Sequence, residues 1–412
     1  MTDNTIDRSA ADRRGTIVII VGTAVSAMSV LVYEAIAGRS LGAEGFAPIG
    51  VLWTIGFMVF TVLMLPVEQF ITRLLVLAGG AAGAVAARSR LIVLVLGGAV
   101  VVGVAFAWLS VDQFFAGNPT WVWIVLTIMI TRAALASARG FLAGRRRFAA
   151  YGAAVAMEGL TLVVLAAGAA LADLGATSYG WAMAVAPLTV FVLRPFRPAA
   201  WSGPVHSEGV SASAFLGWLL VATASAQLVL AGGPIVVGLI GGSSAAVSVF
   251  FVTFTLFRGP ITSAYNLVAR VLPDFTAMAA QGRTAELHRW AWRLLTGGLA
   301  LAALSAAAAG ILGADIVGAI YGSEFTPTSL VAALGGAGVG AGLAVLFVQQ
   351  IYVAAGSTRS LAAGWLAALA IAAGAIAFTA ASDPVLRVAV GFAAGEIAAL
   401  LILGLGVALG RR

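Results

Sequence analysis

The sequence contains 412 residues, of which 61% are hydrophobic and only 9% are charged, and its net charge is +7. Soluble domains carry about 25% charged residues, so this composition excludes a soluble enzyme and indicates a multi-pass protein of the cytoplasmic (inner) membrane. The chain has no cysteine and only two histidines, and it lacks a P-loop motif. We therefore expect no thiolate or histidine metal centre, no cofactor and no ATP hydrolysis through a P-loop.

Twelve segments of the sequence are apolar over the roughly 20 residues that a helix needs to cross a bilayer. The sequence therefore predicts an all-α polytopic membrane protein. The hydrophilic stretch 194–212 contains several prolines and separates an N-terminal six-helix lobe (1–193) from a C-terminal six-helix lobe (213–412). We interpret it as a cytoplasmic inter-lobe linker, although an ordinary long loop fits the same residues. The predicted helices lie near residues 16–38, 47–70, 90–110, 119–140, 148–172, 176–193, 213–240, 245–270, 290–312, 328–355, 359–381 and 385–409.

Arginine predicts the orientation, because all 23 basic residues are arginine. With the N-terminus inside and twelve spans, nineteen arginines lie on the cytoplasmic side, among them Arg139 and the cluster 145–147. Only Arg39 and Arg387 lie on the opposite side. This asymmetry follows the positive-inside rule and predicts that both termini are cytoplasmic. It also supports the number of spans, because one missed helix would invert every later loop.

Two stretches, 37–75 and 238–275, share a layout that suggests an internal repeat. Each has a glycine-rich turn, an apolar span, a proline within the span (Pro66 and Pro260) and an arginine at the inner end (Arg73 and Arg270). Weak symmetry between two halves is typical of secondary transporters.

Three short motifs occur in an order that resembles a known family. They are Ala37-x-Arg39-x-Leu41-Gly42 followed by Phe46, then Leu272-Pro273-Asp274-Phe275 with GRTAELHRW after it, and YGSEF at 321–325. Together with the topology, they resemble the polysaccharide-flippase branch of the multidrug/oligosaccharidyl-lipid/polysaccharide (MOP) exporter superfamily. The chain departs from many relatives in having no acidic residue in the LAGGPIVVG region of the seventh span. It also lacks the two extra helices usual in the lipid II branch.

The resemblance implies a MATE-like fold, in which two six-helix lobes are related by pseudo-two-fold symmetry. It implies alternating-access translocation of a polyprenyl-diphosphate-linked oligosaccharide or polysaccharide repeat unit. Spans one, two, four and five, and seven, eight, ten and eleven, would line the cavity. The implied partners are the lipid-linked glycan, membrane lipids and polysaccharide polymerase machinery, with proton or sodium coupling. We expect no nucleic-acid partner.

Four charged residues lie near the middle of predicted spans, namely Arg132, Glu158, Arg258 and Glu396. Such residues cost roughly 2.5–3.5 kcal/mol each and normally face a cavity or a partner. A guanidinium presents a fork of donors to phosphate oxygens. We therefore predict that Arg258 and Arg132, with Arg73 and Arg270 toward the cytoplasmic mouth, bind the anionic head group of the substrate.

Alternatives remain open for these residues. Arg132 and Glu158 lie on adjacent spans and could neutralise each other. Glu158 could also take part in coupling transport to protons or sodium ions. Glu34 and Glu68 could be proton or cation sites, or could be solvated at the interface. Arg73 and Arg270 could be anchors at the inner membrane face, and packing is the favoured role for Glu396.

Two other functions compete with flipping. A cation-coupled multidrug antiporter of the same superfamily would need acidic residues to dominate the cavity. A membrane glycan polymerase or glycosyltransferase would need an acidic base or a metal site and a sizeable outer loop, and the predicted outer acids are scattered over short loops. We therefore expect a transporter and not an enzyme.

Overall fold

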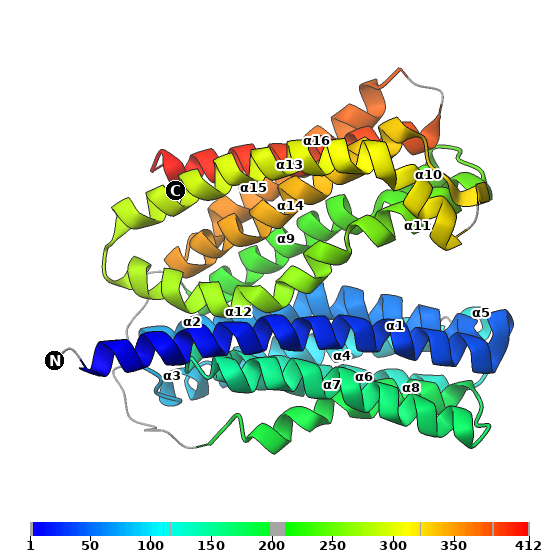
Figure 1. Ribbon diagram of the computed structural model, residues 1–412. Helices are drawn as coiled ribbons and strands as arrows, with labels where there is room; N and C mark the ends of the chain where they lie inside the picture. The colour runs from blue at the N-terminus through cyan, green and yellow to red at the C-terminus, as the bar shows by residue number, and fades with distance from the viewer. Residues whose placement is uncertain are drawn as a thin grey trace. The chain divides into compact units, whose positions relative to one another are not determined.

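A computed structural model describes residues 3–109, 111–115, 117–197, 211–321, 323–380 and 383–410. All regular secondary structure within these ranges is helical, which confirms the predicted all-α class. The chain forms two compact units, Met1–Ser213 and Ala214–Arg412 (Figure 1). Parts of three predicted features lie outside the described residues: 198–210 of the linker, Gly322 of the YGSEF motif, and the C-terminal Arg411 and Arg412.

The N-terminal unit is a bundle of long helices with short connections (Figure 1). Its helices are α1 (Asp3–Val59), the π-helical turn η1 (Phe60–Met64), α2 (Leu65–Leu77), α3 (Gly83–Ala86), α4 (Ser89–Leu109), α5 (Val111–Phe114), α6 (Thr120–Gly144), α7 (Phe148–Leu171), α8 (Ala176–Val185) and the 3-10 helix η2 (Ala186–Leu193).

Helix α1 contains one predicted span and the start of the next, and the chain reverses direction between them. The ring centroids of Tyr33 and Trp53 lie 6.2 Å apart, whereas 20 residues of straight helix would separate them by about 30 Å. The Tyr33 hydroxyl donates a hydrogen bond to the Tyr179 carbonyl (3.1 Å) and ties this region to α8. The two spans are Arg14–Leu41 and Pro48–Leu77.

Glycines allow two pairs of helices in this unit to approach closely. A Cβ atom added at Gly22 of α1 would lie 2.2 Å from the Gly152 carbonyl oxygen of α7. On α6, Gly140 and Gly144 face α2, and a Cβ atom at either would lie within 3.0 Å of α2 atoms. Small residues at such crossings let helix backbones pack closely in membranes. These contacts bring α1 against α7 and α6 against α2, and helices α2, α6 and α7 carry the polar side chains described below.

The C-terminal unit is built around α14, whose residues are mostly buried. Its helices are α9 (Ala212–Ala231), α10 (Gly233–Leu239), α11 (Ser244–Phe257), α12 (Gly259–Ala280), α13 (Thr284–Tyr321), the 3-10 helix η3 (Ser323–Phe325), α14 (Ser329–Ala355), α15 (Thr358–Phe378) and α16 (Pro384–Ala408).

Eleven helices of the described chain are long and apolar enough to cross a membrane. The exception among the twelve predicted spans is 245–270, which is divided at Arg258 into α11 and α12. Gly259 and Pro260 follow Arg258, and proline cannot donate the backbone hydrogen bond that would continue α11. Pro234 follows a similar break between α9 and α10, so the predicted helix 213–240 is also interrupted.

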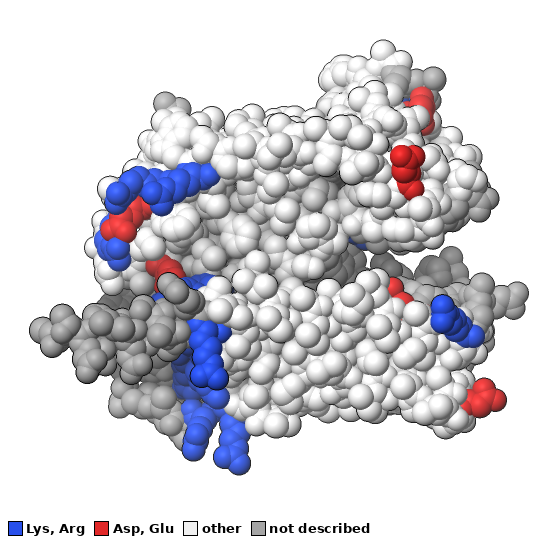
Figure 2. All heavy atoms as spheres, in the orientation of Figure 1, with Lys and Arg blue, Asp and Glu red and all other residues white. Residues whose placement is uncertain are grey.

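Charged side chains gather toward the ends of each unit and leave an uncharged belt between (Figure 2). In the N-terminal unit the connection from α6 to α7 carries Arg145, Arg146 and Arg147. In the C-terminal unit the connection from α12 to α13 carries Arg283. Many large apolar side chains are exposed, as expected for a surface that faces lipid, including Leu94, Val101, Trp108, Leu304 and Ile311.

Candidate functional site

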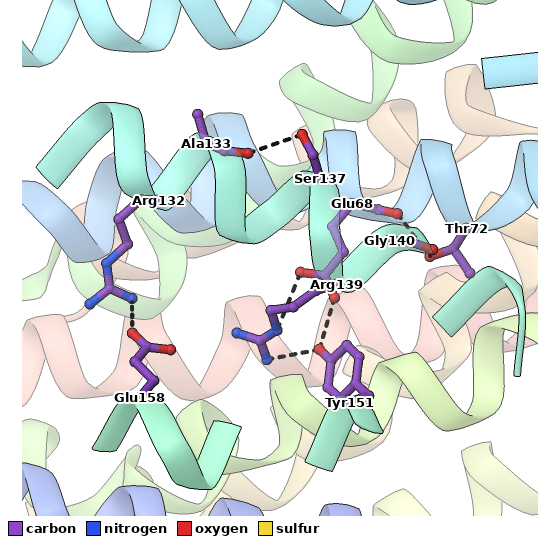
Figure 3. Close-up of polar contacts among 9 residues, drawn as sticks. All are labelled: Glu68, Thr72, Arg132, Ala133, Ser137, Arg139, Gly140, Tyr151 and Glu158. Carbon is purple, nitrogen blue, oxygen red and sulfur yellow. Dashed lines mark hydrogen bonds and ion pairs between the residues drawn. The ribbon is translucent and has the colours of Figure 1, made fainter. Parts of the chain in front are cut away.

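A buried polar network joins three helices of the N-terminal unit (Figure 3). Helix α6 contributes Arg132 and Arg139, α7 contributes Tyr151 and Glu158, and α2 contributes Glu68. The network has two layers, one around Arg139 and one around Arg132.

The helical hairpin of α6 and α7 determines which residues meet. Arg132 and Arg139 are seven residues apart on α6, and Tyr151 and Glu158 are seven apart on α7. Seven residues make about two helical turns, so each pair lies on one face of its helix. Since the two helices are antiparallel, Arg139 meets Tyr151 and Arg132 meets Glu158.

The inner layer forms a continuous chain of hydrogen bonds. Nη2 of Arg139 donates to the Tyr151 hydroxyl (2.8 Å), and this hydroxyl donates to Oε1 of Glu68 (2.8 Å). Nε of Arg139 lies 3.8 Å from Oε2 of Glu68, and its guanidinium carbon lies 4.7 Å from the centre of the Tyr151 ring. Glu68 is 4% exposed and Arg139 is 6% exposed. Buried charges persist only when they are paired and hydrogen-bonded, so Glu68, Arg139 and Tyr151 form one interdependent polar cluster.

The second layer is a more exposed ion pair. Nη1 of Arg132 lies 2.9 Å from Oε1 of Glu158, and the two side chains are 18% and 15% exposed. The guanidinium carbons of Arg132 and Arg139 each lie 5.9 Å from the centre of the Phe60 ring. Phe60 begins the π-helical turn η1, which precedes Pro66. Such turns often occur at functional sites, and here the turn brings an aromatic ring to both layers.

Two of the predicted site residues, Arg132 and Glu158, form an ion pair with each other, and the other predicted site residues lie elsewhere in the two units. Arg132 and Glu158 form the pair that the sequence left open as one alternative. Glu68 is enclosed by protein, so interfacial solvation does not describe it. Arg73 is buried on α2 and Glu34 is partly buried on α1.

The remaining predicted site residues, Arg258 and Arg270, belong to the C-terminal unit. Arg258 is partly buried between α11 and α12. Arg270 forms an ion pair with Asp274, one turn later on α12.

Sequence reasoning missed the roles of Arg139 and Tyr151. Arg139 was counted among the cytoplasmic topology charges, but it is buried against Glu68 and Tyr151. The sequence signal that could have identified Arg139 is its spacing of seven residues from Arg132. Tyr151 and Glu158 have the same spacing on the next helix, so the two pairs face each other across the hairpin.

Solved transporter structures match the fold over almost the whole chain. A mutant of the Vibrio cholerae MATE transporter VcmN has a TM-score of 0.74 and 15% identity, covering 98% of this chain and 97% of that one. A MOP superfamily transporter from Pyrococcus furiosus, with a described reverse polarity of its binding pocket, has a TM-score of 0.71 and 16% identity, covering 97% and 95%. The fold is that of the MATE transporters. Neither a family model nor a curated protein matches the sequence.

The MATE fold confirms the predicted fold class. An outward-facing MATE transporter of the MOP superfamily is similar to the same extent, with a TM-score of 0.70 and 16% identity over 97% of this chain and 95% of that one. At these identities the similarity shows the fold alone. The polysaccharide-flippase branch therefore stays a prediction.

Proposed function

We propose that this protein is a secondary transporter that moves a polyprenyl-diphosphate-linked oligosaccharide or polysaccharide repeat unit across the cytoplasmic membrane by alternating access. The MATE fold supports transport, and the polar groups within the apolar spans support an anionic cargo. The lipid tail would stay in the bilayer while the charged head crosses through the protein.

The observation that carries this proposal is the helix break at Arg258. The preceding helix α11 contains no charged residue, and α12 begins at Gly259, directly after Arg258. The N-terminus of a helix carries a partial positive charge and favours anions. Transporters commonly bind substrate at such interrupted helices near the middle of the bilayer. A guanidinium and a helix N-terminus therefore coincide at this break, and both would favour a diphosphate.

The other predicted ligands take supporting roles in this proposal. Arg132 would contribute by releasing the Glu158 carboxylate and binding a phosphate oxygen in its place. This exchange is possible because the Arg132–Glu158 ion pair is partly exposed. Arg73 and Arg270 would attract the head group toward the cytoplasmic mouth. Arg139 is a positioning residue, since its donors are directed to Tyr151 and Glu68.

Leaflet exchange of a labelled polyprenyl-diphosphate sugar in liposomes tests the proposal. Arg258→Ala should slow exchange about 10- to 100-fold, because a hydrogen bond to a charged group contributes about 1.5–3 kcal/mol. Arg283→Ala is the matched control, because Arg283 is an exposed arginine whose guanidinium pairs with Glu286 at the end of the unit. Wild-type exchange by Arg258→Ala would overturn the head-group role, and drug efflux without lipid exchange would favour the multidrug antiporter.

A further inference from the structure

A second buried carboxylate, Glu396, lies at the middle of α16 in the C-terminal unit. It is the thirteenth of the 25 residues of this helix and is 2% exposed. Among the described residues it has neither a hydrogen bond nor an ion pair. An ionised carboxylate in such a place costs several kcal/mol unless something neutralises it. Packing alone, the role favoured from the sequence, does not supply that neutralisation.

The charged groups of the neighbouring helices do not supply it either. The described parts of α9, α10 and α11 carry no titratable side chain, and α14 carries only Tyr352, whose hydroxyl donates to the Leu403 carbonyl (3.0 Å). On α12, Arg270 is paired with Asp274, and Arg258, at the N-terminal end of this helix, interacts electrostatically with Tyr265. The remaining titratable residues of α13, α15 and α16 lie in the first three or last two turns of these helices, whereas Glu396 lies at the middle of α16. They are Glu286, His288, Arg289, Arg293, Asp315, Tyr321, Arg359 and Arg387.

Glu396 lines a small cavity together with side chains from four other helices. The polar members are Tyr265 of α12, Gln349 of α14 and Trp365 of α15, and Ala226 of α9 is among the apolar ones. Gly342 of α14 faces the carboxylate, and a Cβ atom there would lie 3.1 Å from Oε2 of Glu396. The glycine therefore leaves room for a water molecule or a proton donor beside the carboxylate.

Tyr265 is placed to exchange a proton with this cavity. Its hydroxyl accepts a hydrogen bond from Nε2 of Gln227 (2.8 Å), so its own hydrogen stays available to donate. Tyr265 also lies close enough to Glu396 and to Arg258 to interact electrostatically with both. In contrast, the amide oxygen of Gln349 already accepts from Nε1 of Trp365 (3.2 Å).

We propose that Glu396 is a proton-binding site of the C-terminal unit, and that transport is coupled to its protonation. The carboxylate takes one proton from hydronium in the cavity, which forms one O–H bond and leaves water. It returns the proton when the cavity opens to the other side. The coupling part rests on the proposed transport function, whereas proton binding at Glu396 does not.

The chemistry of the cavity favours a proton over a metal ion. Hard cations such as Ca²⁺ require six to eight oxygen ligands, and Mg²⁺ requires near-octahedral geometry. The side chains that line this cavity offer the Glu396 carboxylate, the Tyr265 hydroxyl and the already engaged Gln349 amide. A single proton neutralises the carboxylate without further ligands.

Infrared spectroscopy of the full-length protein in lipid bilayers tests proton binding directly. Near neutral pH, the wild type should show a carbonyl band of a protonated carboxylic acid that shifts in D₂O. Glu396→Gln should lose this band, whereas Glu158→Gln, which removes a carboxylate paired with Arg132, should retain it. An unchanged band in Glu396→Gln, or no such band in the wild type, overturns the proposal. Loss of the wild-type band on adding Na⁺ assigns the site to sodium and also overturns it.

A second variant and a transport measurement complete the test. Gly342→Ala places a methyl group against Oε2 of Glu396 and should shift the acid band, so the site stays testable if Glu396→Gln does not fold; an unshifted band in this variant contradicts the proposal. In liposomes, an imposed pH gradient should accelerate lipid exchange in the wild type and leave Glu396→Gln unaffected. If the band belongs to Glu396 but the wild type moves no lipid-linked sugar, the proposed substrate fails while the proton site stands.

Discussion

The two units hold buried carboxylates in opposite ways. In the N-terminal unit Glu68 and Glu158 each face an arginine of α6, at 3.8 Å and 2.9 Å. In the C-terminal unit Glu396 is as deeply buried as Glu68, but it has no ion-pair or hydrogen-bond partner in the described chain. A paired carboxylate can stay ionised in the protein interior, whereas an unpaired one is neutralised only by binding a proton. The comparison separates carboxylates that are balanced by arginine from one that needs a proton to be neutral.

The largest effect should come from breaking the inner layer of the N-terminal network. Glu68→Ala leaves the Arg139 charge buried without its carboxylate, which should lower the free energy of unfolding by about 3–5 kcal/mol. Thermal or denaturant unfolding in bicelles measures this loss. The double variant Glu68→Met with Arg139→Met should recover much of it, because no buried charge is then left over. Equal losses in the single and double variants would contradict the pairing.

A smaller effect should follow from removing the hydroxyl that links the inner layer. Tyr151→Phe takes away the donor to Glu68 and the acceptor of Arg139. Leaving buried groups unsatisfied costs about 1–3 kcal/mol, so unfolding should shift by this amount in the same assay. Tyr179→Phe provides a tyrosine control, because Tyr179 of α8 is also buried and its hydroxyl has no hydrogen-bond partner among the described residues. An unchanged stability of Tyr151→Phe would show that the three residues do not act as one unit.

The second layer should matter less for stability. Arg132 and Glu158 are partly exposed, and exposed ion pairs contribute about 0.2–1 kcal/mol. Glu158→Gln should therefore change the free energy of unfolding by about 1 kcal/mol or less, but it should alter lipid exchange, because it frees Arg132 for the cargo. A large destabilisation without any change in exchange would assign the pair to structure alone.

The smallest effect on stability is expected at Glu396. Glu396→Gln removes no ion pair or hydrogen bond found in the described chain, and under our proposal a neutral amide replaces a protonated acid. The free energy of unfolding should change by less than about 1 kcal/mol, in contrast to Glu68→Ala. A loss as large as that of Glu68→Ala would mean that Glu396 has an ionic partner and would remove the difference between the two units.

The sequence predicted the spans well because hydropathy depends on composition over about 20 residues. It missed the break at Arg258, since an apolar count takes no account of backbone hydrogen bonds, although Pro260 marked the position. The sequence also gave no measure of how tightly helices approach, so the contact of Gly22 with Gly152 was not foreseen.

The candidate site was predicted only in part, for two physical reasons. The sequence identified Arg132 and Glu158 as possible partners, because adjacent spans with opposite charges at similar depth often pair. Arg139 was assigned to the membrane surface, because charge counting along the chain cannot show that a side chain turns inward toward another helix. Glu396 was assigned to packing, because the cavity beside it is formed by residues of α9, α12, α14 and α15 that are distant in sequence.

The most direct test of the central claim compares two cargo lipids that share the same polyprenyl chain and sugar. One carries a diphosphate link and the other an uncharged link, and both are followed for leaflet exchange in liposomes containing the wild-type protein. If arginine at the helix break recognises the phosphate, only the diphosphate lipid should exchange rapidly, and Arg258→Ala should abolish the difference. Equal exchange of both lipids by the wild type would contradict the account.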